Sequence, residues 1–249
     1  MNTRGHFTPE EWQLRVDLAA CYRLVAMFGW DDLIFTHISA RVPGPDAHFL
    51  INAYGLMFEE MTASSLVKVN LAGEKVSDSP YDINPAGFTI HSAIHEARDN
   101  AHVVMHLHTN AGVAVSVQEA GLLPLSQTSL FPSASLSYHD YEGVALYPEE
   151  KARLVSDLGA TGTMILRNHG LLTIGKDCAD AFLKMYILNR ACEIQIMAQA
   201  GGGTLRVLPQ SMIDNIRAQF KAVTNNAGAS LTWPGLLRKL DRTNPGYDA

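Results

Sequence analysis

The segment Val103–Ser116, VVMHLHTNAGVAVS, constrains the fold of this chain more than any other stretch. Its first residues are β-branched or large and apolar with no helix breaker, which predicts a buried strand. The strand ends at His106 and His108, whose imidazoles should share one face because side chains two residues apart on a strand point the same way. Their Cα atoms would be about 7 Å apart. This spacing suits two ligands of one metal ion, and the alternative is two polar residues on the exposed side of a strand end.

A second apolar stretch, Thr163–Arg167 (TMILR), also predicts a buried strand, and it ends at Asn168-His169-Gly170. If the two strands lie near each other in the sheet, His169 could complete a site of three histidines. Three neutral imidazoles with an open position are typical of a catalytic divalent metal, usually zinc but also manganese, iron or cobalt. The glycine at 170 would permit a close approach or an unusual backbone angle. The alternative is that His169 merely opens a turn.

Several strands followed by alternating strands and helices predict a mixed α/β domain. Thr8 and Pro9 form a good helix start. Helices are expected at about 9–28, 88–98, 110–119, 148–158, 177–200 and 209–223, the fifth of them stopped by the glycines at 201–203. Strands are expected at 33–42, 48–52, 66–71, 102–108 and 163–167, which 171–174 could continue.

We expect a single domain over residues 1–224. The tail at 225–249 is rich in Asn, Gly and Pro. It is expected to be loosely ordered or packed on a neighbouring subunit, with Trp233 and Leu236–Leu237 as an anchor.

Charge and composition exclude several classes of protein. Of the residues, 47% are hydrophobic and 18% charged, which is ordinary for a globular core. A net charge of −6 without a Lys/Arg cluster argues against nucleic-acid or anionic-membrane binding. No signal-like segment or apolar run of about 18 residues is present, so a cytoplasmic protein is expected. Cys21, Cys178 and Cys192 are far apart and odd in number, which predicts buried thiols and no disulfide.

VVMHLHTNAGVAVS, followed some sixty residues later by ILRNHGLL, resembles the class II aldolase/adducin family over roughly residues 10–220. NPAGFTIHSAIHEAR, SYHDYEG and the ACEIQ helix resemble the adducin-type branch. The resemblance implies an α/β/α layered fold around a mainly antiparallel sheet. It also implies a homotetramer with active sites between subunits, and a divalent metal, first of all zinc, on His106, His108 and His169.

The chain departs from the sugar-phosphate aldolases of that family at the residues that carry protons and phosphate. Those enzymes have an acidic residue four positions before the helix histidine that matches His91, and here that position is Gly87. Pro85 and Ala86 stand in place of the phosphate-binding serines. The Gly-Asn phosphate loop corresponds to the segment at 36–39. Both phosphate recognition and the usual proton carrier are therefore in doubt.

Another group would then have to carry protons, and imidazoles suit this because they titrate near neutral pH. His139, in SYHDYEG, is the first candidate, although it could be a surface-loop histidine. Tyr141 or Tyr138 would be its neighbour and His91 the reserve. Our candidates for substrate binding are His37, Ser39, Asn52 and Gly55.

His91 and His95 are one helical turn apart, but HSAIH lacks the glutamate of a zinc-protease HExxH motif. His91 is interpreted as a residue that lines the pocket, and His95-Glu96 as a solvated helix surface.

These features predict a metal-dependent carbon–carbon lyase, of aldolase or decarboxylase type, acting on a small non-phosphorylated hydroxy-, keto- or aromatic carboxylate. A Lewis-acid metal can polarise a carbonyl even without the missing acid. One alternative is a non-haem iron oxygenase on the same scaffold. Another is a non-catalytic adducin-like assembly module.

Overall fold

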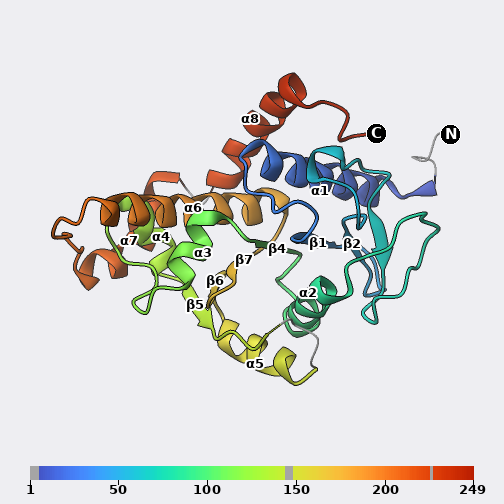
Figure 1. Cartoon of the computed structure of the whole chain (residues 1–249). Coiled ribbons are helices and arrows are strands. Elements are labelled where there is room, and N and C mark those ends of the chain that lie inside the picture. Colours follow the sequence, from blue (N-terminus) through green and yellow to red (C-terminus); the bar gives the residue numbers. More distant parts are fainter. Residues whose placement is uncertain (1–5, 144–147, 225–226) are drawn as a thin grey trace.

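The computed structural model describes residues 6–143, 148–224 and 227–249. Among these, seven strands form one sheet in the order β3-β2-β1-β4-β7-β6-β5 (Figure 1). Neighbouring strands are antiparallel except β5 and β6, which are parallel. The strands are β1 (His37–Arg41), β2 (Phe49–Ile51), β3 (Val67–Val69), β4 (Val103–Leu107), β5 (Leu136–His139), β6 (Thr163–Leu166) and β7 (Gly170–Gly175).

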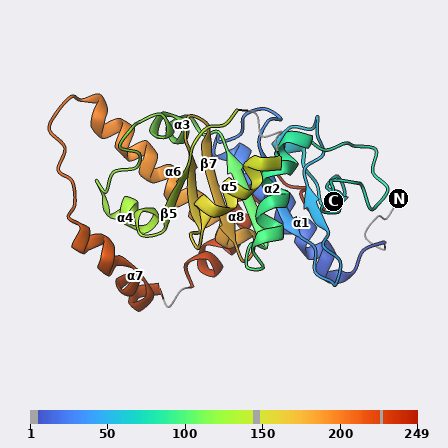
Figure 2. The same ribbon diagram turned by 90° about the horizontal axis from the view of Figure 1, so that it is seen from below.

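Helices cover both faces of the sheet, as Figures 1 and 2 show from two directions. The layers formed by α1 and α6 on one face and by α2 and α5 on the other confirm the α/β/α arrangement. The helices are α1 (Pro9–Met27), α2 (Pro85–Ala97), α3 (Asn110–Ser116), α4 (Gln127–Ser133), α5 (Pro148–Leu158), α6 (Cys178–Ala200), α7 (Gln210–Thr224) and α8 (Gly228–Thr243), with a short 3₁₀ helix η2 (Phe58–Glu60).

Strand β4 divides its side chains between two cores. Val103 and Met105 pack in the cluster that includes α1 and α6. Val104 packs with residues of α2 and α5. Since side chains alternate along a strand, His106 shares the face of Val104 and points toward the α2 layer. The alternation thus places the first histidine of the HxH pair under α2, close to the end of the sheet's central strand.

Helix termini follow the expected signals. The side chain of Thr8 caps α1 and accepts a hydrogen bond from the backbone N–H of Glu11 at 3.2 Å. Helix α6 ends at Ala200, just before the glycine run, and Gly202 has a left-handed φ of +65°. The three cysteines are buried free thiols, as predicted. No helix within the described residues is long and apolar enough to cross a membrane.

Some predicted boundaries are wrong. Residues 33–36 are not part of a strand; Leu33 has a left-handed φ of +52°, so the chain turns there and β1 starts at His37. Residues 171–174 do not continue β6. They belong to β7, which returns antiparallel to β6 after a turn at Asn168, where φ is +56°. The sequence signals for β5 and α4 were missed because LSYH is half polar and QTSLFPS contains Pro132.

The C-terminal segment, expected to be loosely ordered or packed on a neighbouring subunit, forms helix α8, which packs on α1 and α6 of its own chain. The indole of Trp233 donates a hydrogen bond to Asp17 at 3.2 Å, and Leu240 is fully buried. The Asn/Gly/Pro composition concealed a helical spacing of apolar residues, at 233, 236, 237 and 240. Trp233, Leu236 and Leu237 do anchor the segment to the main core.

Candidate active site

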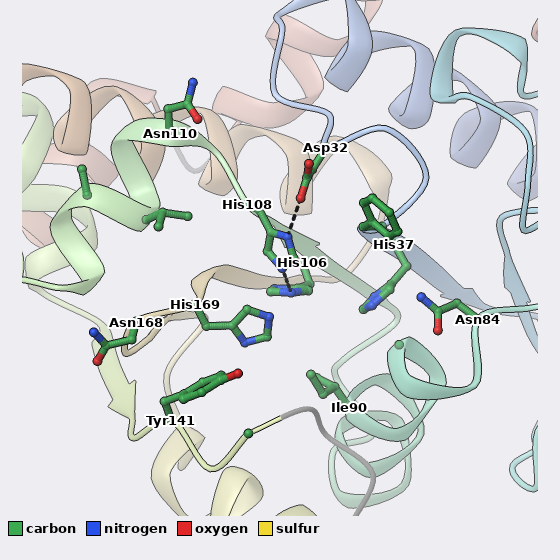
Figure 3. A pocket seen from close by; sticks show the side chains of 15 residues that line it. Asp32, His37, Asn84, Ile90, His106, His108, Asn110, Tyr141, Asn168 and His169 are labelled. Atoms are coloured by element: carbon green, nitrogen blue, oxygen red, sulfur yellow. Dashed lines mark hydrogen bonds and ion pairs between the residues drawn. The ribbon is translucent and has the colours of Figure 1, made fainter.

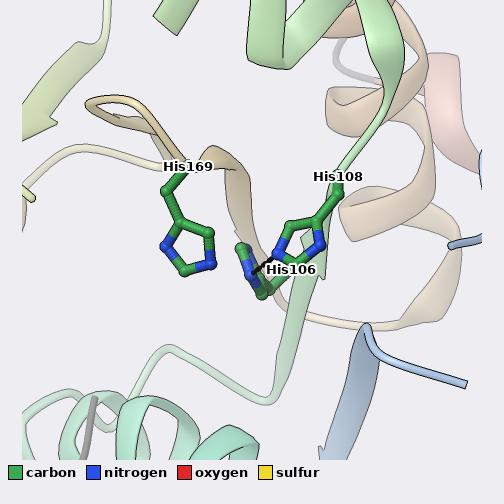
Figure 4. A group of neighbouring side chains, drawn as sticks. All are labelled: His106, His108 and His169. Carbon is green, nitrogen blue, oxygen red and sulfur yellow. Dashed lines mark hydrogen bonds between the residues drawn. The ribbon is translucent and has the colours of Figure 1, made fainter. Parts of the chain in front are cut away.

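Three histidines from two places in the sheet converge above the end of β4 (Figure 4). His106 lies on β4, His108 just beyond its end, and His169 in the turn between β6 and β7. One ring nitrogen of each histidine lies within 4.8 Å of a ring nitrogen of the other two. Among the described residues, this is the one group of three or more His, Cys, Asp or Glu side chains close enough together to hold a metal ion. β4 and β6 are not neighbours, because β7 lies between them. The turn before β7 is what brings His169 beside the HxH pair.

The hydrogen bonds of two of these rings fix where their protons are. Nδ1 of His106 donates to the carbonyl oxygen of Leu171 at 3.0 Å, and Nδ1 of His108 donates to Oδ2 of Asp32 at 3.0 Å. When both rings are neutral, each Nε2 carries a lone pair, and the two atoms face each other at 3.0 Å (Figure 3). Two facing lone pairs repel unless a cation lies beside them. This donor set fits a divalent metal, and the Asp32–His108 pair is the outer partner typical of metal-binding histidines.

Burial keeps the rings of His106 and His169 in the neutral form, which binds metal. The pKa of His106 lies well below its usual value, first because burial disfavours the charged form and then because His169, His37 and His108 are close. Burial, helped by His108 and His139, lowers the pKa of His169 to about 4. Metal binds the neutral form of an imidazole, so neither His106 nor His169 has to lose a proton first.

The conformation of the turn that carries His169 depends on the residues on either side of it, Asn168 and Gly170. Asn168 adopts the left-handed conformation, which asparagine tolerates better than most residues. A Cβ on Gly170 would lie 2.5 Å from the carbonyl oxygen of Leu107. Glycine at this position thus allows the start of β7 to approach β4 closely. This approach lets His169 reach the other two histidines.

A cavity of about 820 Å³ opens over the three histidines (Figure 3). Three asparagine side chains supply polar groups, and none of the described lining residues is a lysine or arginine. The lining consists of Asp32, Phe35, His37, Asn84, Gly87, Ile90, His106, His108, Asn110, Val113, Ala114, Tyr141, Gly143, Asn168 and His169.

Behind the cavity wall, β1 and α2 are joined by buried polar side chains. His37 lies opposite His106 in the β1–β4 register and lines the cavity. Its Nδ1 is 2.7 Å from Nε2 of His91, and Ser39 is hydrogen-bonded to both His91 and His95. His91 and Ser39 are buried and do not line the cavity. The interpretation of His95 as a solvated surface residue is wrong: it is 1% exposed, because this face of α2 packs on the sheet.

Gly87 stands where the sugar-phosphate aldolases have an acidic residue. The position of His37 explains why the acidic side chain is absent here. A Cβ at residue 87 would lie 2.1 Å from Cδ2 and 2.3 Å from Nε2 of His37. Any side chain there would overlap the imidazole. The ring of His37 therefore occupies the space that an acidic side chain at 87 would need.

His139, our first candidate for proton transfer, ends β5 outside the main cavity. It is buried, with Nδ1 2.7 Å from Oδ2 of Asp157 and Nε2 3.8 Å from Oε1 of Glu150. Nε2 has no hydrogen-bond partner among the described residues. With Tyr141 and His169 it lines a small adjoining cavity of about 10 Å³, enough for about one water molecule. His139 can thus reach the site only through its neighbours.

Tyr141 lines the main cavity itself, with its ring centroid 6.1 Å from that of His169 (Figure 3). Tyr138 does not line it; its hydroxyl accepts a hydrogen bond from the backbone N–H of Leu122 at 3.0 Å, and Arg167 stacks on its ring.

Two candidates for substrate binding lie elsewhere. Asn52 is buried and hydrogen-bonded to Tyr22, and Gly55 lies in a loop with φ +104°; neither lines the cavity. Sequence analysis missed Asp32 and the three cavity asparagines, at 84, 110 and 168. Asp32 is 76 residues from His108, so no local spacing could have linked them.

Comparison with known proteins agrees with this geometry. Residues 16–196 match the Class II Aldolase and Adducin N-terminal domain. The chain belongs to this family. It is 62% identical over 249 residues to the "Putative aldolase class 2 protein" of Pseudomonas aeruginosa, covering 99% of this chain and 96% of that protein. It is also 44% identical over 220 residues to alpha-adducin of Rattus norvegicus, of which the match covers 29%, against 86% of this chain.

Solved structures of the family show the same fold. The crystal structure of an aldolase II superfamily protein from Pseudomonas syringae superposes with a TM-score of 0.94 at 49% identity, covering 99% of both chains. L-fuculose 1-phosphate aldolase from Glaciozyma antarctica superposes with a TM-score of 0.82 at 27% identity, covering 94% of this chain and 92% of the other. The mainly antiparallel class II aldolase fold expected from the sequence is thereby confirmed.

Proposed function

We propose that this member of the class II aldolase family is a divalent-metal-dependent carbon–carbon lyase, of aldolase or decarboxylase type. Its substrate would be a small non-phosphorylated hydroxy-, keto- or aromatic carboxylate. The observation that carries the proposal is the facing pair of Nε2 atoms of His106 and His108, with His169 beside them. Such an arrangement would be unfavourable in a purely structural site, because nothing there would offset the repulsion between the two nitrogen atoms.

His106, His108 and His169 would hold the metal, with zinc as the first choice and manganese, iron or cobalt as alternatives. Such an ion supplies Lewis-acid polarisation of a carbonyl, the common need of retro-aldol cleavage and decarboxylation. The protein's part is to keep His106 and His169 neutral by burial and to orient His106 and His108. Asp32 and the carbonyl of Leu171 do the orienting.

Two features favour a substrate without phosphate. Phosphate sites usually present arginine, lysine or clustered donors, and no described lining residue of the cavity is cationic. The wall beside Gly87 is filled by the ring of His37. Amide side chains at 84, 110 and 168 suit the hydroxyl and carboxylate oxygens of a smaller molecule.

Tyr141 and His139 remain our candidates for proton transfer, and the reserve, His91, is buried behind the cavity wall and could act only through His37. Tyr141 is half exposed and lines the cavity, so its hydroxyl can reach a bound substrate. His139 is paired with Asp157 and shares the small second cavity with Tyr141. A proton could therefore pass from His139 to the site through that shared space.

We also propose a homotetramer with active sites between subunits. Phe35 and Tyr141 line the cavity and are about half exposed, and Leu33, two residues before Phe35 in the chain, is exposed as well. A neighbouring subunit would cover them. Light scattering at micromolar concentration should give the mass of four chains, and a monomer would contradict the proposal.

The function is tested by metal analysis of protein purified without added metal, followed by cleavage assays. We expect about one divalent ion per chain and cleavage of some small hydroxy- or keto-carboxylate. L-fuculose 1-phosphate, the substrate named for one relative, serves as the comparison and should be cleaved poorly. Efficient cleavage of this sugar phosphate would contradict the substrate class, and an iron form that consumes oxygen without any cleavage would favour an oxygenase.

The similarity to alpha-adducin supports one other function, a non-catalytic assembly module. An assembly module of this kind would not need a metal site, nor the hydrogen bonds that orient His106 and His108 for metal binding. Protein that holds no divalent metal and cleaves none of these carboxylates would favour it over the lyase.

A further inference from the structure

Four buried side chains connect the cavity to the interior of the protein. His37 and Ser39 point to the same face of β1, and His91 and His95 are one turn apart on the facing side of α2. Each is at most 4% exposed. Their contacts form one line: His37 to His91 at 2.7 Å, His91 to Ser39, and Ser39 to His95 at 2.7 Å. We call these four residues the relay.

The inner end of the relay fixes where its protons lie. Nδ1 of His95 is 2.8 Å from the carbonyl oxygen of Ala101, which can only accept. His95 therefore carries its proton on Nδ1, and its Nε2 is an acceptor. The hydroxyl of Ser39 must donate its single proton to that Nε2. Ser39 then has only a lone pair for Nδ1 of His91, which must be the donor of that contact.

The same logic continues to the cavity. Since His91 is protonated on Nδ1, its Nε2 accepts from Nδ1 of His37. His37 thus has its proton on Nδ1 and a bare Nε2, and all four donors point into the protein. That Nε2 has no partner among the described residues, and His37 lines the cavity directly opposite His106.

The reverse arrangement fails at one contact. A proton on Nε2 of His37 would require His91 to donate from its own Nε2 and to accept from Ser39. Nε2 of His95 and the oxygen of Ser39, 2.7 Å apart, would then face each other with no proton between them. Such a contact is unfavourable where neither group can reach water.

We propose that the relay holds Nε2 of His37 as a fixed hydrogen-bond acceptor, and that this atom recognises a hydroxyl of the substrate next to the three-histidine site. The inference rests on the proposed function for the identity of the bound molecule, which it narrows to hydroxy-carboxylates. A keto or methoxy group in the same place would put two acceptors face to face. His37 is therefore a specificity-determining residue, and Ser39, His91 and His95 are positioning residues.

Neutron diffraction from crystals exchanged into D₂O tests the relay directly. We expect deuterium on Nδ1 and none on Nε2 in His37, His91 and His95, and a water donating a deuteron to Nε2 of His37. Ser39→Ala removes the link, so deuterium should then appear on Nε2 of His37 in part of the molecules. Ser92→Ala removes a different buried serine, which lies on α2 and donates a hydrogen bond to the carbonyl oxygen of Thr89. Ser92 is outside the relay, so this variant should leave the pattern unchanged. Deuterium on Nε2 of His37 in the unaltered protein would overturn the proposal.

Binding of two probes to the metal-loaded protein tests the recognition of a hydroxyl. Glycolate and methoxyacetate differ only by methylation of that hydroxyl. We expect the unaltered protein and Ser92→Ala to bind glycolate about tenfold more tightly, the value of one good hydrogen bond. In His37→Phe, which keeps a ring of similar shape, the ratio should fall toward one.

The outcomes separate the two proposals. An unchanged ratio in His37→Phe, or no binding of either acid to protein with full metal content, would overturn recognition by His37. Protein without any metal would instead count against the lyase function, while the deuterium positions would still decide the relay.

Discussion

Oδ2 of Asp32 lies 3.0 Å from Nδ1 of His108, although the two residues are 76 positions apart in the chain. The contact joins the loop before β1 to the end of β4, and both residues line the cavity. It holds the imidazole of His108 with its Nε2 toward His106. Asp32 would therefore act on the proposed metal site by orienting a ligand, and not as a ligand itself.

Asp32→Ala should weaken metal binding by about 10- to 100-fold, because outer partners of ligand histidines contribute to affinity on that scale. Competition with a chromogenic chelator measures this. Asp31→Ala removes the adjacent carboxylate, which does not contact His108, and should bind metal as the unaltered protein does. An unchanged affinity in Asp32→Ala would show that the contact has no role in the site.

Replacing His106, His108 or His169 by Ala should remove most of the bound metal in each case. Each substitution deletes one of three ligands, and the two that remain make a poor site. Elemental analysis of the purified variants measures the loss, with the exposed His102→Ala as control. Full metal content in all three variants would refute the ligand assignment.

Gly87→Ala should destabilise the protein by about 1–3 kcal/mol, the usual cost of overpacking. The added Cβ would lie 2.1 Å from Cδ2 of His37. In His37→Ala the space is free, so adding Gly87→Ala to that variant should cost much less. Urea unfolding of both single variants and the double variant gives the coupling energy, expected to exceed about 0.5 kcal/mol.

Gly203→Ala is the matched control for this cycle, because a Cβ there meets nothing within 4 Å. Additive effects of Gly87→Ala and His37→Ala would mean that the ring of His37 moves aside without cost.

The sequence was most informative where one local pattern decided the structure. The alternation of VVMHLH placed His106 and His108 correctly because a strand has a period of two. The glycine at 170 predicted the close approach that lets His169 reach them, whereas the turn at Asn168 was not predicted. The family resemblance predicted the layers and the antiparallel sheet.

The sequence was least informative where two distant segments meet. His95 was interpreted as a surface residue because its partners, Ser39 and the carbonyl of Ala101, cannot be read from the helix itself. The mutual exclusion of His37 and a side chain at 87 depends on how α2 packs on β1. His139 likewise has a partner, Asp157, that only the packing of α5 on β5 reveals.

His139→Ala should keep its metal and its oligomeric state but lose turnover of a cleaved substrate by about two to four orders of magnitude. Tyr141→Phe should have a loss of similar size if the phenol is the group that meets the substrate. The control is His102→Ala. Wild-type rates in both variants would pass the role to His91 or to another group.

Acid should destabilise the protein because the relay histidines are neutral when folded. Burial, the largest cause, lowers the pKa of His95 to about 3, and it lowers the pKa of His91 as well. In the unfolded chain a histidine titrates near 6.5, so between pH 6.5 and about 3 the unfolded state binds more protons. The stability that these neutral histidines contribute is therefore fully present above pH 6.5. It falls as the pH is lowered, by at most about 1.4 kcal/mol per pH unit for each such histidine.

Urea unfolding at pH 7.5, 6.0 and 5.0 measures how steeply the free energy of unfolding falls with pH. His95→Phe should make it shallower, whereas His6→Gln, an exposed control, should not. An equal slope in His95→Phe would mean that His95 takes up its proton in the folded protein as readily as in the unfolded chain.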